Sequence, residues 1–151
     1  TKPCLFLKGD NMAEYTAVAT QTVAANSNVM LTEAPACGGK CIEHRSGSGL
    51  ITLRGLTNQC RARYKVSFSG NIAIPTGGTV GAIQLALAVQ GEALPSTVMI
   101  TTPAAVEEFN NVGSAVYIEV PRGCCVTVAV RNTSTQAVAV ANANVIAERV
   151  A

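Results

Sequence analysis

The amino-acid sequence predicts an all-β domain of the sandwich or barrel type, and three observations support this. Stretches with an apolar residue at every second position recur along the chain, whereas helical periodicity is almost absent. Gly, Asn, Pro and Ser separate these stretches at short intervals. The chain has 151 residues, 48% of them hydrophobic, which suffices for one domain with its own core. Many short strands at this spacing are typical of β-sandwiches and β-barrels.

About ten strands are expected. They cover approximately residues 15–24, 28–32, 41–45, 49–54, 61–73, 81–90, 94–102, 113–120, 124–132 and 136–149. The clearest begins at Arg61, where apolar residues at the even positions 62 to 68 alternate with polar residues at the odd positions. We expect residues 1–11 to form an N-terminal arm, because a clean strand pattern starts after Met12. Residues 12–151 form a single domain, since no linker or repeat interrupts the pattern.

The low charge of the chain predicts self-association. Charged residues make up only 13% of it, about half the usual share in soluble domains, and the net charge is +2. Such a chain buries its surface in an oligomer or in a membrane. No run of 18 apolar residues exists, so membrane insertion is not expected and an oligomer is favoured. The small basic cluster of Arg61, Arg63 and Lys65 has no interleaved aromatic residues, so we expect a solvated row and no nucleic-acid binding.

Two of the expected strands carry alanine on the face opposite their large residues. The strand 81–90 has this pattern, and so does the last strand, 136–149. A solvated face would normally carry Lys, Glu or Thr. We interpret these faces as surfaces buried by neighbouring subunits, and the alternative is that alanine is simply a common residue in this genome. The candidate interface residues are Ala86, Ala88, Ala137, Ala139 and Ala141.

Three segments resemble the complement-head and tumour-necrosis-factor-like jelly-roll family. Ser-Gly-Leu-Ile-Thr-Leu at 48–53, then Arg-Tyr-Lys-Val-Ser-Phe at 63–68, resembles the family's central hairpin, in which an aromatic "Y-x-V-x-F" strand follows a strand and a turn. Val-Pro-Arg-Gly-Cys-Cys-Val-Thr-Val at 120–128 occupies the place of the family's "L-x-x-G-D-x-V-x-L" turn and strand. Asn-Thr-Ser at 132–134, before a long final strand at 138–150, is similar to the family's C-terminal ending.

The resemblance covers most of residues 15–151 and implies a jelly-roll β-sandwich that forms a homotrimer. Bacterial members of this family cap collagen-like spore-surface proteins, and others resemble bacteriophage head-fibre, decoration or tail-fibre domains. No collagen-like Gly-X-Y tract precedes the domain, which favours a phage particle protein or a free trimer. The expected function is therefore structural: a trimeric component of a virion or an extracellular surface, with capsid or tail proteins as partners. Cys124 replaces the family's acidic turn residue, so calcium binding is not carried over and no cofactor is expected.

The six cysteines are the main candidates for chemistry. The spacing of Cys37, Cys41 and His44 fits no standard zinc pattern, so a metal site is not expected. Disulfides are favoured, because an even number of cysteines is usual in small extracellular proteins. Free buried thiols are the alternative. The candidate disulfide cysteines are Cys4, Cys37, Cys41, Cys60, Cys124 and Cys125.

The fold implied by the resemblance suggests pairings without fixing them. It places the turns before the strands 61–73 and 124–132 at the same end, so Cys60 would approach Cys124 or Cys125. Cys37 and Cys41 would close a short loop around two glycines. Neighbouring residues of a strand face opposite ways. The outward-facing member of the adjacent pair would then reach Cys4, in the same or in another subunit.

Catalysis is not expected, and a second kind of binding function remains open. His44 is the only histidine, and Glu43 would point to the opposite face of its strand, so a Cys–His–acid arrangement is not indicated. Glu107 and Glu108 are neighbours in sequence and do not oppose one another across a substrate bond. The alternative function is an adhesin head that binds a surface glycan or a receptor. Its candidate ligand loop, an aromatic residue beside two amides, comprises Phe109, Asn110 and Asn111.

Overall fold

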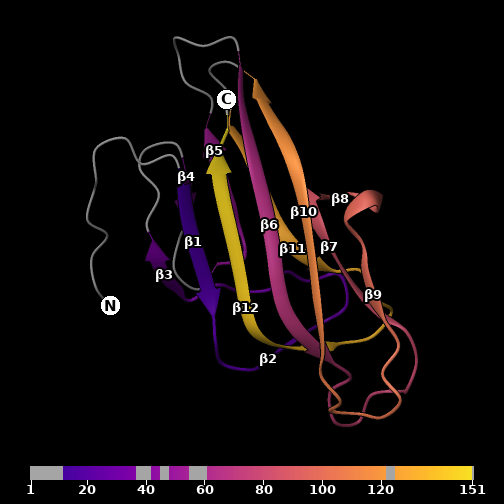
Figure 1. Cartoon of the computed structure of the whole chain (residues 1–151). Coiled ribbons are helices and arrows are strands. Elements are labelled where there is room, and N and C mark those ends of the chain that lie inside the picture. The colour runs from indigo at the N-terminus through magenta and orange to yellow at the C-terminus, as the bar shows by residue number, and fades with distance from the viewer. Residues whose placement is uncertain (1–11, 37–41, 45–47, 55–60, 122–124, 151) are drawn as a thin grey trace.

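The computed structural model describes residues 12–36, 42–44, 48–54, 61–121 and 125–150. These residues form two antiparallel β-sheets that pack face to face, with one short 3-10 turn at Pro95–Thr97 (Figure 1). The architecture confirms the predicted all-β jelly-roll β-sandwich. The expected N-terminal arm, residues 1–11, lies outside the described residues.

The first sheet has the strand order β10-β6-β12-β1-β3, and β2 pairs with the first three residues of β12. Its two longest pairings join β6 to β10 and β6 to β12, so β6 is the central strand of its widest part. The strands of this sheet are β1 (Met12–Ala17), β2 (Gln21–Val23), β3 (Glu33–Ala36), β6 (Arg61–Ala73), β10 (Asn110–Pro121) and β12 (Val138–Arg149).

The second sheet lies behind the first in Figure 1 and has the order β4-β5-β11-β7-β8, with β9 also paired to β7. Its central strand is β11, which pairs with β5 over its first half and with β7 over its second half. The strands of this sheet are β4 (Ile42–His44), β5 (Ile51–Arg54), β7 (Ile83–Val89), β8 (Glu92–Ala93), β9 (Met99–Thr101) and β11 (Cys125–Asn132).

The described residues contain twelve strands where about ten were expected. The predicted strand 15–24 divides into β1 and β2, and 94–102 divides into the 3-10 turn and β9. The predicted strand 28–32 is instead a crossover between the sheets. The backbone N–H of Val29 donates to Val130 O in the second sheet, and that of Thr32 donates to Thr16 O in the first. A segment that changes sheet within four residues cannot continue one ladder.

The core lies between the sheets and follows the predicted alternation. The even positions of β6 from Ala62 to Phe68 are almost completely buried, and so are Ile83, Leu85 and Leu87 of β7. Burying each large apolar side chain stabilises the fold by about 1.5–3 kcal/mol. Tyr64 also links the two sheets, since its hydroxyl donates a hydrogen bond of 2.7 Å to the backbone oxygen of Arg54 in β5.

The turn between β11 and β12 is fixed by a buried amide. Asn132 has no exposed surface, and its Nδ2 donates to Val23 O at 2.9 Å and to Gln136 O at 3.0 Å. Its Oδ1 accepts a hydrogen bond from the backbone N–H of Ser134 at 2.9 Å. The Ser134 hydroxyl in turn donates to Gln84 O at 2.9 Å. The Asn-Thr-Ser segment therefore connects β2 and β7 with the turn between β11 and β12.

Candidate functional site

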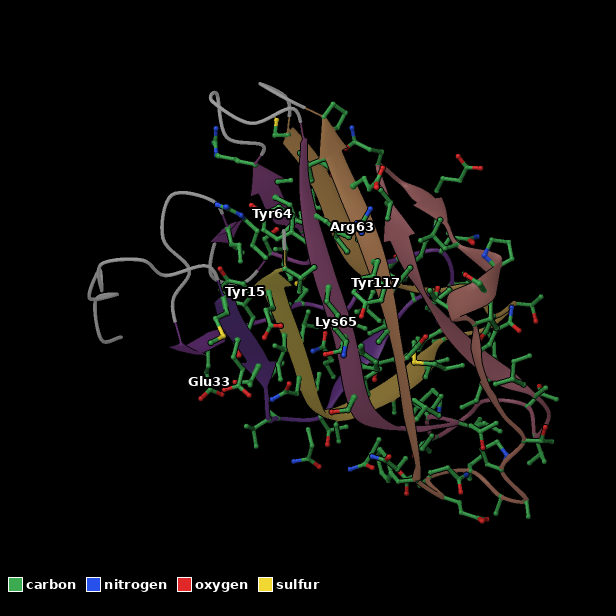
Figure 2. The ribbon with its side chains drawn as sticks, turned by 45° about the horizontal axis from the view of Figure 1, so that its top comes forward. Tyr15, Glu33, Arg63, Tyr64, Lys65 and Tyr117 are labelled. Atoms are coloured by element: carbon green, nitrogen blue, oxygen red, sulfur yellow. The ribbon has the colours of Figure 1, made fainter. Side chains whose placement is uncertain are left out.

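The outer face of the first sheet carries a group of exposed apolar side chains. Tyr117 on β10 is 64% exposed, Met12 on β1 is 55% exposed and Ile146 on β12 is 40% exposed. The strand register places Tyr117 opposite Lys65 on β6, as Figure 2 shows. Ile146 lies in the next row, opposite Ser67. We call the outward side chains of these strands the Tyr117 face.

Small residues fill the space between the large ones on the Tyr117 face. Ala115 of β10 pairs with Ser67 of β6 in the row that contains Ile146. Gly113 pairs with Ser69 in the following row. The rows of Ala115 and Gly113 on β10 and β6 are therefore without charge. The charged residues of the face are Lys65 and, beside it on β12, Glu148, which lie between Tyr117 and Met12, and Glu14 of β1, which lies opposite Ile146.

Polar groups bound the Tyr117 face at both ends. At one end Arg63 Nη2 and Glu119 Oε1 form an ion pair of 2.7 Å, and both side chains are exposed. At the other end three amides form a ladder across β10, β6 and β12. Asn111 Nδ2 donates to Asn71 Oδ1, and Asn71 Nδ2 donates to Asn142 Oδ1, each at 3.2 Å.

The five candidate interface alanines do not form one surface. Ala86 and Ala88 lie on β7 in the second sheet, whereas Ala139 and Ala141 lie on β12 in the first, and Ala137 directly precedes β12. Burial of Ala86, Ala88 and Ala139 is already nearly complete within the chain, since each is at most 7% exposed. These three therefore have almost no surface left for a neighbouring subunit. Ala137 and Ala141 are half-buried.

The alanines of β7 make room for an arginine of the same chain. Arg131 of β11 pairs with Ala86 across the strands, and its Nη1 donates to Gly91 O at 2.9 Å. Its side chain therefore reaches from the Ala86 row to the turn that follows β7. A subunit interface at the five alanines stays a prediction.

The candidate ligand loop is divided between a loop and a strand. Phe109 is exposed at the end of the loop that leads into β10, whereas Asn110 and Asn111 already belong to β10. The Asn111 amide is engaged, because its Nδ2 donates to Gly70 O and to Asn71 Oδ1. The loop itself is fixed by the Glu107 backbone N–H, which donates to Ile74 O at 2.7 Å. Ligand binding at this loop stays a prediction.

Of the candidate disulfide cysteines, only Cys125 belongs to the part of the chain that the structure describes, and it is an exposed free thiol. The other five, Cys4, Cys37, Cys41, Cys60 and Cys124, lie outside the described residues. His44 lies in the short strand β4. Nowhere among the described residues do three His, Cys, Asp or Glu side chains gather as metal ligands would. None of the helical segments described is long and apolar enough to cross a membrane.

The outer face of the second sheet holds a pocket of about 130 Å³. Its floor is the cross-strand pair of Ala88 and Ala129, and Arg131, Asn28 and Leu50 are among the residues that line it. We call it the Arg131 pocket. Sequence reasoning missed it, because its residues come from separate segments that only the folded sheet brings together.

The order of the strands and the packing of the two sheets define the C1q/TNF-like jelly-roll fold. No family model and no curated protein matches the sequence. The solved structures that match cover nearly the whole chain at very low identity, so they show the fold alone. The match to a TNF named Eiger from S. frugiperda has a TM-score of 0.69 at 12% identity, covering 94% of this chain and 93% of that one.

Two other solved structures have the same fold. The globular domain of the zebrafish complement 1qA protein matches with a TM-score of 0.64 at 10% identity, covering 91% of this chain and 94% of that one. Murine APRIL at pH 5.0 matches with a TM-score of 0.62 at 12% identity, covering 91% of this chain and 98% of that one. None of the three is named as an enzyme.

Proposed function

We propose that this chain is a non-enzymatic interaction module that forms a homotrimer through its Tyr117 face. The observation that carries the proposal is that exposed Tyr117, Ile146 and Met12 share one sheet face. Small residues of β10 and β6 lie between Tyr117 and Ile146, and the opposite charges of Lys65 and Glu148 lie side by side between Tyr117 and Met12. Large exposed apolar groups with polar residues around them mark interaction sites on soluble proteins. The low charge of the whole chain, 13%, points the same way.

The layout of the Tyr117 face is that of a protein–protein interface. Such interfaces have an apolar core depleted of charge and a polar rim, with aromatic residues and Met enriched. Here the apolar centre lies between the Arg63–Glu119 ion pair at one end and the amide ladder at the other. Tyr117 is the natural anchor, since a large aromatic residue gains the most from burial.

The position of β10 supports a ring of subunits. β10 is an edge strand of the first sheet, and its twelve residues would present unpaired backbone groups to solvent. If the β10 edge of one subunit packs against the Tyr117 face of the next, both surfaces are covered. The contact then joins two different surfaces, and such head-to-tail contacts close into a ring at a fixed number of copies. We take that number to be three, as the family resemblance implies.

Sedimentation analysis tests the trimer. Wild-type protein at micromolar concentration is expected to sediment as a trimer, and Tyr117→Lys and Ile146→Asp as monomers, because each places a charge in the apolar centre. Ile100→Asp is the matched control, since Ile100 is just as apolar and exposed but lies on β9 of the second sheet. A wild-type monomer or dimer overturns the proposal, and so does a control that dissociates like the two variants.

We further propose that the trimer is a component of a virion, as a capsid decoration, head-fibre or tail-fibre domain, or of another extracellular surface. This part rests on the sequence resemblance. Capsid, portal or tail genes beside the coding sequence would support the virion assignment, and their absence would count against it. Co-sedimentation with purified particles is the direct test, because a decoration protein binds the assembled surface.

A second candidate function is a carbohydrate- or receptor-binding adhesin head. The observation that favours it is the exposed ring of Phe109 beside Asn110 at the start of β10. Sugar rings stack on exposed aromatic rings while amides bind their hydroxyls. The variant Phe109→Ala keeps Phe6 and the buried Phe68. Loss of glycan-array binding in this variant would support the adhesin function. A wild-type protein that binds no glycan and no host cell excludes it.

A further inference from the structure

We propose that the Arg131 pocket binds a carboxylated sugar, with the guanidinium of Arg131 paired to the carboxylate of the ligand. The pocket lies on the second sheet, whereas the proposed trimer contact uses the first. It therefore stays open when the Tyr117 face is covered. The inference goes beyond the proposed assembly and can fail independently of it.

The pocket has depth because its floor is made of the smallest side chains. Ala88 of β7 and Ala129 of β11 face each other across the strands, and Gly91 follows at the turn after β7. Leu50, an exposed residue just before β5, forms an apolar rim. The volume of about 130 Å³ suits one sugar ring and excludes a bulky chain. The site would therefore take a terminal residue.

Arg131 is fixed in position, while most N–H donors of its guanidinium form no hydrogen bond with the described residues. Its backbone lies in β11, paired with Ala86 on one side and bridged to Asn28 on the other. Nη1 donates to Gly91 O at 2.9 Å, which fixes the guanidinium beside the pocket. A guanidinium has five N–H donors in a planar fork, so one such bond leaves a pair free for a bidentate carboxylate. No Asp or Glu of the described residues forms an ion pair with it.

Two asparagines add groups that suit hydroxyls. Asn26 and Asn28 line the pocket, and their side chains form no hydrogen bond with the described residues. Their backbone is fixed, because the N–H of Asn26 donates to Asn132 O at 2.9 Å and Asn28 bridges to Arg131. An amide offers both a donor and an acceptor, as a sugar hydroxyl does. Thr127, whose hydroxyl bonds Gln90 Oε1 at 2.9 Å, completes the polar wall.

This combination selects among anionic ligands. A phosphate carries two charges and is usually held by several cations or by a helix N-terminus, whereas Arg131 is the one cationic residue among the described residues that line the pocket. A nucleotide base would require an aromatic platform, and the described residues that line the pocket include no aromatic one. A single carboxylate on a hydroxyl-bearing ring matches one guanidinium, free amides and an apolar floor.

The test compares matched sugars on the assembled full chain. Methyl glucuronide and N-acetylneuraminic acid are titrated beside methyl glucoside, which has the ring without the carboxylate, and beside N-acetylaspartate, which has carboxylates without the ring. We expect saturable binding of at least one acid sugar, with both comparison compounds about tenfold weaker or more, which is about 1.4 kcal/mol. If neither acid sugar binds, the proposal is overturned. Equal affinity for the glucoside or for N-acetylaspartate also overturns it.

Variants then locate the binding site. Arg131→Gln removes the cation, and Asn28→Asp places a carboxylate against that of the ligand, so each should weaken binding about tenfold or more. Arg54→Gln is the matched control, because Arg54 is exposed on β5 of the same sheet without lining the pocket. Undiminished affinity in Arg131→Gln sinks the proposal. If Arg131→Gln does not fold, binding is measured in Asn28→Asp and in Ala129→Leu, which fills the pocket. Undiminished affinity in these two variants then overturns the proposal. Sedimentation of each variant separates loss of the pocket from loss of the trimer.

Discussion

Asn132 shows how much one buried amide contributes to this fold. It uses both Nδ2 protons and its Oδ1, and its three partners are backbone groups of Val23, Gln136 and Ser134. Backbone groups buried without a partner are strongly unfavourable. The side chain thus supplies the hydrogen bonds that a β-ladder would otherwise give to these backbone groups. It does so where the chain leaves β11 of the second sheet and turns toward β12 of the first.

Replacing Asn132 with Ala should lower the free energy of unfolding by about 2–4 kcal/mol, because the Val23, Gln136 and Ser134 backbone groups lose their partner while staying buried. Urea unfolding measures the change. The matched control is Asn111→Ala. The Asn111 side chain is exposed, and its hydrogen bonds to Gly70 O and Asn71 Oδ1 should contribute less than about 1 kcal/mol. Equal losses in the two variants would contradict this account.

A single hydroxyl joins the sheets at Tyr64. Tyr64→Phe should cost about 1 kcal/mol, because the ring still fills the core while the hydrogen bond to Arg54 O is lost. Thermal or chemical unfolding of the variant measures it. Tyr117→Phe makes the same chemical change on an exposed ring and should leave stability unchanged. A loss in the second variant as large as in the first would show that the Tyr64 bond is not the cause.

At the scale of elements, β6 and β12 approach closely at a glycine. Gly70 lies inside β6, and a Cβ added there would come within 3.0 Å of Phe68 Cζ and 3.5 Å of Ala143 Cα. Ala143 belongs to the part of β12 where the register shifts between Ala141 and Asn144. The bulge and the glycine therefore occupy one site, where the ring of Phe68 covers the backbone. Bulges of this kind bend a strand and increase its twist.

Gly70→Val should destabilise the protein by about 1–3 kcal/mol, because the added methyl groups force the Phe68 ring or the β12 bulge to move. Gly81→Val is the control. A Cβ at Gly81 meets nothing within 4 Å, and that variant should stay within about 0.5 kcal/mol of wild type. Differential scanning calorimetry of both variants measures the contrast. Two equal melting temperatures would contradict the close approach.

The elements that the sequence predicted best are those whose own residues determine them. β6 and β7 alternate large inward and small or polar outward residues, so their faces are visible without a partner. The crossover at 28–32 was predicted as a strand, because its change of sheet depends on Thr16 and Val130, which are far away in sequence. The alanines of β7 were ambiguous for a physical reason. A small side chain makes room equally for another subunit or for Arg131 of the same chain.

At the scale of the whole molecule, the Tyr117 face could not be predicted from any one segment. Tyr117, Ile146 and Met12 are each ordinary exposed apolar residues on separate strands. They become one surface only through the register of four strands. The same holds for the Arg131 pocket, whose floor and walls come from distant parts of the chain. The two outer faces of the sandwich thus differ: one suits a flat apolar contact and the other a small polar ligand.

If the trimer forms through the Tyr117 face, thermal stability should depend on protein concentration. The melting temperature of wild-type protein should rise with concentration, because association stabilises the folded state by mass action. That of Tyr117→Lys should not change over the same range. Scanning fluorimetry across a hundredfold dilution series measures this. A wild-type melting temperature independent of concentration would contradict trimer formation through this face.

The buried amide of Asn132 also has a consequence for how the protein can be produced. Asn-Thr-Ser at 132–134 is an acceptor sequence for N-linked glycosylation, the modification of an asparagine side chain in the secretory pathway. A glycan on Nδ2 would occupy the atom that bonds Val23 O and Gln136 O, so a modified chain cannot adopt this turn. Folding and glycosylation therefore compete for the same nitrogen. In a eukaryotic secretory host, the chains that fold would be those that escape the oligosaccharide transferase.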